Sequence, residues 1–311
     1  PIVLALVNRA LSGPININAD HSDSMGARDT GWIQIYAESN QEVYDNFIQA
    51  FPIAEDKRVH LPVMVCQDGF ITSHGVENIL LEEDDKVKHF VGAYEPEHYL
   101  LNPNEKMAVG PYAVSNYYME TKRAQREAMI QAKQVILEVA AKFEELTGRK
   151  YSFFEAYQME DAEYAVVIIG SAAGTCKAAI DEIRNTTGKK VGLIKIRVFR
   201  PFPEEEIAAA LSKVKAVAIM DRSEMFAATS GPLGAEVRAA MYQARCNAET
   251  VNYFYGLGGR DITVSDFKTV YENLEKIADT KTVTGMYDYI GLRRRQSVEE
   301  SSSKEHGGLE A

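Results

Sequence analysis

The chain has 311 residues, a net charge of −11, 46% apolar residues and 25% charged residues. These values are typical of a folded globular protein with room for two domains, each with its own core. The acidic balance argues against nucleic acid as a partner, because a phosphate backbone needs clustered lysine and arginine. No apolar run approaches the roughly 18 to 20 residues of a membrane span and no signal peptide is visible, so we expect no membrane partner and a cytoplasmic protein.

Three cysteines, Cys66, Cys176 and Cys246, are far apart in the sequence. They form no CxxC pair and no cysteine–histidine spacing, so the sequence predicts no zinc or iron–sulfur site built by this chain alone. An odd number of cysteines without a disulfide framework fits a reducing compartment. We therefore expect three small buried apolar side chains and no metal site.

The first third of the chain alternates between strand and helix patterns. Apolar runs predict strands at 1–7, 31–37 and 61–69, and a helical spacing predicts a helix over 40–56. This order is typical of a parallel sheet with helical crossovers. The chain begins directly inside the first apolar run, whereas a buried parallel strand normally follows a turn or helix. We therefore expect a first domain that is incomplete at its N-terminus, with the preceding segment removed or on another chain.

A second series of strands and helices follows a connector. Residues 96–112 are rich in proline, asparagine and glycine, and residues 113–147 predict one long helix that ends at Gly148. Beyond it, strand patterns at 164–170, 191–199, 216–223 and 250–256 alternate with helical patterns at 175–186, 203–212, 233–245 and 265–277. From about Gln296 onward the composition is that of a disordered tail.

The predicted fold class is α/β, with two open, mostly parallel-sheet domains, of which the first is incomplete. The expected boundaries are 1–95 for the first domain, 96–160 for the connector and long helix, 161–278 for the second domain and 279–311 for a tail.

Arg9 stands directly after the first predicted strand, at the edge of a parallel sheet where α/β proteins bind ligands. We expect that strand to be buried on both faces, so a guanidinium that cannot lose its charge needs an anionic partner there. Two partners remain open. One is the carboxylate or phosphate of a bound substrate, and the other is an internal carboxylate from Asp20, Asp23 or Asp29.

The loop after this strand carries further titratable side chains. His21 stands between acidic residues and can act either as a proton donor near neutral pH or as a hydrogen-bonded residue that holds the loop. Arg28 and Asp29 can equally form a local cap before the next strand.

One glycine-containing turn, Gly170–Thr175, lies between a strand and a helix, as phosphate-binding loops do. It lacks the third glycine of a dinucleotide-binding motif and a Walker lysine. We expect a tight turn without a ligand, and no nucleotide binding by the isolated chain.

Three stretches together resemble one known family: "NRALSGPININADHSDSMGARDTGWIQIYAESNQEVYD", "LPVMVCQDGFITSH" and "VGLIKIRVFRPFPEEEI". From residue 1 to about 290, the chain is similar to the alpha subunit of pyruvate:ferredoxin oxidoreductase and its 2-oxoacid relatives, which include an oxalate branch. The resemblance implies a thiamine-diphosphate enzyme of transketolase-like architecture. Residues 1–95 would be the later part of a pyrimidine-type domain, and 161–278 a transketolase C-terminal-like domain.

The resemblance also assigns a site. In the family the arginine of the "RALS" motif contacts the substrate carboxylate, and it matches Arg9. Asn18 stands where relatives that act on pyruvate commonly carry tryptophan, so a more polar pocket is expected there. The family's substrate-contacting threonine and cofactor-activating glutamate lie upstream of this motif and are absent from this sequence. Behind Arg9 we expect a shell that keeps the loop rigid, formed by Asp20, His21, Asp23, Arg28 and Asp29.

The implied activity is oxidative decarboxylation of a small 2-oxo acid, pyruvate before others, with ferredoxin as electron acceptor. Oxalate is the alternative substrate that Asn18 favours, and a non-catalytic scaffold subunit is an alternative of another class. Thiamine diphosphate, Mg²⁺ and [4Fe-4S] clusters would be held mainly by the beta, gamma and ferredoxin-like cluster subunits. The participation of coenzyme A is left open.

Overall fold

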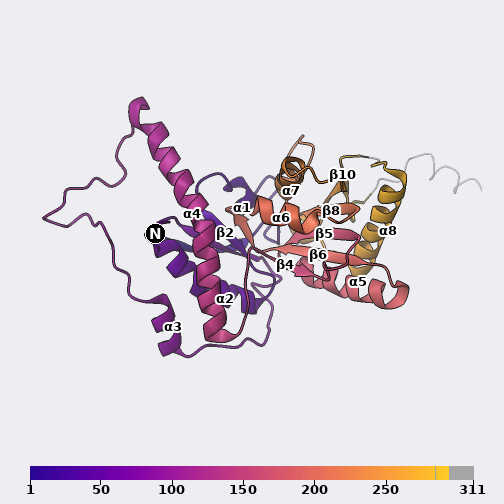
Figure 1. Cartoon of the computed structure of the whole chain (residues 1–311), viewed down its shortest axis with the longest axis horizontal. Helices are drawn as coiled ribbons and strands as arrows, with labels where there is room; N and C mark the ends of the chain where they lie inside the picture. Colours follow the sequence, from indigo (N-terminus) through magenta and orange to yellow (C-terminus); the bar gives the residue numbers. More distant parts are fainter. Residues whose placement is uncertain (284, 294–311) are drawn as a thin grey trace, which may run out of the picture.

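The computed structural model describes residues 1–283 and 285–293, which form two β-sheets side by side along the length of the molecule (Figure 1). The tail predicted to be disordered from Gln296 lies outside the described residues. The sheets come largely from the two predicted series of strands, and they are joined by the long helix and by one strand exchanged between the halves.

The first sheet has the strand order β1-β3-β2-β7. Its members β1 (Val3–Asn8), β3 (Val63–Asp68) and β2 (Ile33–Tyr36) run parallel, as the predicted crossovers require. Helix α2 (Asn40–Glu55) packs against β3, and α4 (Ser115–Thr147) packs against α2. One buried apolar cluster joins these elements into the core of this half.

The connector before the long helix contains no helix or strand from residue 92 to residue 114. It loops away from the sheets and leads into the projecting first turns of α4 (Figure 1). The helix ends where the sequence predicts, at Gly148, which adopts the left-handed conformation at φ 74° that favours glycine.

The second sheet has the order β10-β9-β8-β5-β6-β4, in which only β4 runs antiparallel to its neighbour. Helices α5 (Ala172–Thr187) and α8 (Val264–Thr280) share one apolar cluster with the sheet, and α6 (Glu204–Leu211) and α7 (Pro232–Gln243) share another. The strands are β4 (Phe154–Tyr157), β5 (Tyr164–Ile169), β6 (Val191–Ile196), β8 (Ala216–Asp221), β9 (Glu249–Phe254) and β10 (Tyr287–Tyr289).

The single strand predicted over 191–199 is wrong, because the chain changes sheets within it. Residues up to Ile196 belong to β6, whereas β7 (Val198–Arg200) pairs antiparallel with β2 in the first sheet. The buried Arg197 stands at the change, and its guanidinium donates to the amide oxygens of Asn46 and Gln49 at 2.8 and 3.1 Å. Burial lowers the pKa of Arg197 to about 10. Apolar patterning does not reveal such a crossing, since both strands are equally buried.

The expectation that the strand before Arg9 is buried on both faces is wrong, because β1 is an edge strand with exposed side chains. Among the described strands it pairs only with β3, at the edge of its sheet, and Leu4 is 36% exposed, while Ile2, just before the strand, is 61% exposed. The apolar composition of the strand therefore does not reflect burial within the described residues.

Five short elements of the described residues were not predicted. They have three to eight residues, too few for a clear periodicity. One of them, β10, lies within the stretch predicted as a tail and pairs with β9. The five are α1 (Ser22–Gly26), α3 (Asp84–Val91), β4, the 3₁₀ helix η1 (Leu257–Gly259) and β10.

The cysteines occupy apolar surroundings. Cys66 and Cys176 are buried and Cys246 is half-buried. Burial raises the pKa of the Cys176 thiol to about 12, so it is a poor nucleophile at neutral pH. None of the described helices combines the length and the apolar character needed to cross a membrane.

Candidate active site

Side chains from both sheets converge where parallel strands end. Asn8 and Asp68 are the last residues of β1 and β3, Ser171 follows β5, and Arg222 follows β8. Since the carboxyl ends of parallel strands form the ligand-binding edge of α/β sheets, this is the candidate site.

Arg9 is exposed just beyond this edge. Its backbone N–H donates to Asp23 Oδ2 at 2.8 Å, so the backbone is held while the side chain extends outward. Among the described residues, no carboxylate oxygen lies within 4.0 Å of its guanidinium. Its Cζ atom lies 5.7 Å from the ring centre of Phe70. The side chain therefore presents a positive charge that other described residues do not neutralise.

The three aspartates considered as internal partners of Arg9 bind other groups. Asp20 accepts the backbone N–H of Ser22 at 2.8 Å and that of Gly258 at 3.2 Å. Asp23 accepts from the Asn8 side chain and from the backbone of Arg9 and Ser24. The pKa of Asp23 is raised above its ordinary value, because the effect of burial is larger than that of these hydrogen bonds, which by themselves would lower it. The third, Asp29, is 74% exposed.

Arg28 and Asp29 lie at the other end of the loop. The Arg28 guanidinium donates to the Met25 carbonyl at 3.1 Å and lies 3.5 Å from the Asp29 carboxylate. Asp29 also pairs with Arg200 at 3.3 Å. Within the described residues, these contacts do not reach Arg9, so the structure does not bring the predicted shell together as one unit.

His21 and Asp68 form the buried centre of the site. His21 Nε2 donates to Asp68 Oδ1 at 2.7 Å, and the other carboxylate oxygen accepts the Ser171 backbone N–H at 2.9 Å and Arg222 Nη1 at 3.1 Å. Burial alone would raise the pKa of Asp68, but His21, Arg222 and the Ser171 hydroxyl hold it well below its ordinary value. The pair therefore joins the loop, the first sheet and the second sheet through one ionised carboxylate.

The turn Gly170–Thr175 does not offer its amides to a phosphate. The Ser171 backbone N–H and hydroxyl both donate to Asp68, and a side chain at Gly170 would lie 2.8 Å from the same carboxylate. The helix start that a phosphate would use thus binds an internal anion instead.

Asn18 is exposed on the loop segment that contacts the second half of the chain. Its backbone N–H donates to Asn16 Oδ1 at 2.8 Å, and the side chain of Asn16 donates to the Gly258 carbonyl at 3.1 Å. The Gly259 N–H donates to the Ala19 carbonyl at 2.8 Å. The loop that follows Arg9 is thus fastened to the turn after β9.

The described residues do not fit the diphosphate and magnesium of thiamine diphosphate. One group of carboxylates, Glu38, Glu42 and Glu155, lies close enough together to hold a cation. Lys195 pairs with all three, and Lys177 pairs with Glu38 and Glu155. Lysine ammonium groups thus neutralise the carboxylates that a magnesium ion would need. The backbone N–H of Ser171, at the start of α5, is already bound by the Asp68 carboxylate and does not face a phosphate.

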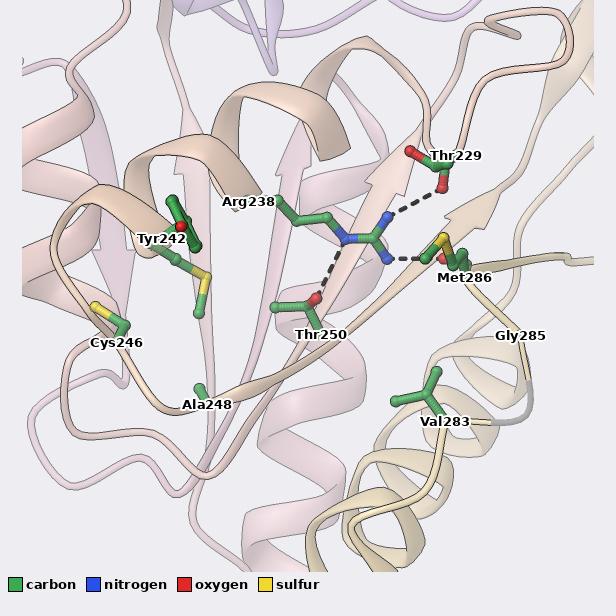
Figure 2. A pocket seen from close by; sticks show the side chains of 10 residues that line it. Thr229, Arg238, Tyr242, Cys246, Ala248, Thr250, Val283, Gly285 and Met286 are labelled. Atoms are coloured by element: carbon green, nitrogen blue, oxygen red, sulfur yellow. Dashed lines mark hydrogen bonds between the residues drawn. The ribbon is translucent and has the colours of Figure 1, made fainter.

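A separate cavity of about 650 Å³ lies between α7, the start of β9 and the segment before β10 (Figure 2). Arg238, the one charged residue among the described residues that line it, donates to Thr250 Oγ1 and to the carbonyls of Thr229 and Met286. These hydrogen bonds hold the guanidinium of Arg238 against the wall of the cavity (Figure 2). None of the described residues that line this cavity is one of the charged groups at the strand ends described above, so we do not assign the active site to it.

Sequence reasoning did not identify Asp68, Ser171 and Arg222 as one cluster. Each lies at or just after the carboxyl end of a predicted strand, and that position was the available signal. The order of the strands was needed to combine them, because Ser171 and Arg222 belong to another sheet than Asp68.

The two mostly parallel sheets, with polar and charged side chains at their strand ends, define an α/β protein. A solved 2-oxoglutarate:ferredoxin oxidoreductase from Magnetococcus marinus shares the fold, with a TM-score of 0.59 and 16% identity over 88% of this chain. This chain spans 49% of that one.

Sequence comparisons identify the family. Residues 1–141 match the family model described as "Pyruvate flavodoxin/ferredoxin oxidoreductase, thiamine diP-bdg", and residues 162–267 match "Pyruvate:ferredoxin oxidoreductase core domain II". Pyruvate synthase subunit PorA of Methanocaldococcus jannaschii is 44% identical over 94% of this chain and 73% of its own length. The Thermotoga maritima protein of that name is 47% identical over 94% and 74%. The chain therefore belongs to the family of pyruvate:ferredoxin oxidoreductase alpha subunits, as its motifs indicate.

Proposed function

We propose that this chain is the substrate-anchoring subunit of a thiamine-diphosphate-dependent 2-oxoacid:ferredoxin oxidoreductase, with pyruvate as its substrate. The observation that carries the proposal is Arg9, an exposed guanidinium at the carboxyl edge of a parallel sheet with no carboxylate within 4.0 Å among the described residues. The names of the pyruvate synthase relatives support pyruvate as the substrate.

In this proposal Arg9 binds the carboxylate of the 2-oxo acid by charge-assisted hydrogen bonds and orients the neighbouring carbonyl. Asp23 fixes the backbone of Arg9, and the His21–Asp68 pair holds the loop behind it. Thiamine diphosphate would supply the carbanion stabilisation that decarboxylation needs. Its diphosphate and Mg²⁺, and the [4Fe-4S] clusters that carry electrons to ferredoxin, belong on the beta, gamma and ferredoxin-like partner subunits.

The test replaces Arg9 by alanine or lysine in the assembled complex and measures ferredoxin reduction with pyruvate. Losing a hydrogen bond to a charged group costs on the order of 1.5–3 kcal/mol, so Arg9→Ala should lower kcat/KM by roughly tenfold to a hundredfold. Arg9→Lys keeps the charge but loses the two-pronged geometry, and it should fall in between. Arg123→Ala, on the exposed part of α4, is the control. Full activity of Arg9→Ala would refute the anchoring role.

Assays on the same complex distinguish the two alternatives, a more polar substrate and a non-catalytic scaffold subunit. Asn18 favours a more polar substrate, so the assay includes oxalate and branched-chain 2-oxo acids, each with and without coenzyme A. A scaffold subunit would show no substrate effect on its own loop. Protection of residues 9–23 from hydrogen exchange by pyruvate, lost in Arg9→Ala, would exclude the scaffold.

A further inference from the structure

Phe70, two residues beyond the end of β3, has an unusual backbone. Its φ angle is 64°, in the left-handed region that bulky side chains rarely adopt. The turn is held by local hydrogen bonds: the Phe70 N–H donates to Ser73 Oγ at 2.9 Å, and the Ser73 hydroxyl lies 2.7 Å from His74 Nδ1. A glycine would adopt this conformation without strain, so the presence of an aromatic ring calls for an explanation.

The ring of Phe70 lies beside Arg9. Its centre is 5.7 Å from Arg9 Cζ, within the range of a cation–π interaction, and it stacks with the His74 ring at 4.3 Å and 12°. The side chain is 40% exposed, so it is not held in place by a core.

Gly69 allows the side chains of Arg9 and Phe70 to lie close together. A Cβ atom at this position would lie 2.6 Å from the Asn8 carbonyl and 3.3 Å from Arg9 Cγ, so only glycine permits this approach of β3 to β1. The next residue towards the core is Asp68, whose carboxylate is fixed by His21, Ser171 and Arg222. The aromatic ring is therefore attached to one of the most firmly bound points of the site.

We propose that Phe70 is a positioning residue for Arg9. Its ring holds the guanidinium in the orientation that meets the substrate carboxylate, and the left-handed turn serves to place that ring. The inference rests on the proposed function of Arg9 and names a residue that acts through it.

The experiment compares three variants of Phe70 in the assembled complex with pyruvate. Phe70→Leu retains bulk but removes the π face, and we expect KM to rise roughly three- to tenfold with kcat within about twofold. Phe70→Tyr retains the face and should keep KM within about twofold of wild type. Phe70→Gly relieves the backbone, so it should raise KM like Phe70→Leu without lowering Tm. Phe226→Leu, at a 90% exposed phenylalanine in another loop, is the matched control.

A structural role alone would produce another pattern, because KM would then follow stability. A wild-type KM for Phe70→Leu, or equal damage from Phe70→Tyr, would overturn the proposal. So would loss of subunit assembly in Phe70→Leu but not in Arg9→Lys, since the ring would then act on an interface.

A double variant separates this inference from the function on which it rests. If Phe70 acts through Arg9, Phe70→Leu should add little to the defect of Arg9→Ala. Independent, multiplying effects would overturn the role of Phe70 and leave the anchoring role of Arg9 intact. If Arg9 does not anchor the substrate, Arg9→Ala keeps full activity, whatever the effect of the Phe70 variants.

Discussion

Ser171 donates both its backbone N–H and its hydroxyl to the buried carboxylate of Asp68. One residue starts helix α5 over the second sheet, and the other ends strand β3 of the first sheet. With His21 and Arg222 on the same carboxylate, this contact ties the two halves of the chain together at the strand end where Asp68 pairs with Asn8, the residue before Arg9. The stability of the junction and the geometry of the site therefore depend on one ionised group.

Asp68→Asn should destabilise the protein, by about 3–5 kcal/mol, because it leaves the charge of Arg222 buried without its partner. The pKa of Asp68 in the folded state is depressed below the unfolded value of about 4. Its ionised form therefore contributes stability that is present above about pH 4 and is lost as the pH falls below it. Urea unfolding between pH 3 and 7 should show a smaller acid-induced loss in the variant than in wild type. Parallel curves would contradict this origin of the acid sensitivity.

Asp221 should have the opposite pH dependence. Burial raises its pKa to about 6, although it accepts the Leu233 and Gly234 N–H groups and the Asn252 side chain. A carboxyl with a raised folded pKa binds its proton more tightly when folded, so its contribution falls as the pH rises from about 4 to 6. The stability of wild type relative to Asp221→Asn should decline over this interval by on the order of 2–3 kcal/mol. A pH-independent difference between the two unfolding free energies would speak against it.

Lys195→Met should leave three carboxylates facing one another. Burial would lower the pKa of Lys195, but Glu42, Glu38 and Glu155 hold it above its ordinary value, so at neutral pH the ammonium contributes its full stabilisation. Its loss should cost about 3 kcal/mol at pH 7.5. The loss should shrink at pH 5, because the carboxyls can then take up protons. Thermal unfolding at both pH values checks this, and Lys215→Met, which removes an exposed pair with Glu163, is the control.

Gly259→Ala should loosen the loop that follows Arg9. The φ angle of Gly259 is 83°, and a Cβ atom there would lie 2.4 Å from Asn18 Cβ. The substitution should therefore displace the bond from the Gly259 N–H to the Ala19 carbonyl. We expect a loss of about 1–3 kcal/mol and a higher KM for the 2-oxo acid. Gly188→Ala, also at positive φ but with open space around it, is the control for the backbone term alone.

Asp29→Asn should change little. Asp29 is 74% exposed, and Arg28 keeps its bond to the Met25 carbonyl without it. Exposed ion pairs contribute about 0–1 kcal/mol, so Tm should fall only slightly and KM should stay near that of wild type. A large rise in KM would restore Asp29 to the rigid shell that the sequence suggested.

The sequence alone determined the order of the main strands and helices and the parallel arrangement within each half. Apolar runs and helical spacing depend on local burial, and β3, α2, α4 and α8 follow them closely. The motif around Arg9 also identified the family. The short elements α1, α3, β4, η1 and β10 were not predicted because three to eight residues carry too little periodicity.

Only the tertiary structure decided which charged groups meet. Ser171 and Arg222 lie 103 and 154 residues from Asp68 in the sequence, and no local pattern pairs either of them with its carboxylate. The change of sheets at Arg197 and the edge position of β1 likewise depend on strand order, which side-chain alternation does not encode. Which aspartate neutralises which cation is set by distance and burial in the folded chain, and none of Asp20, Asp23 and Asp29 lies within 4.0 Å of the Arg9 guanidinium, although Asp23 binds the Arg9 backbone.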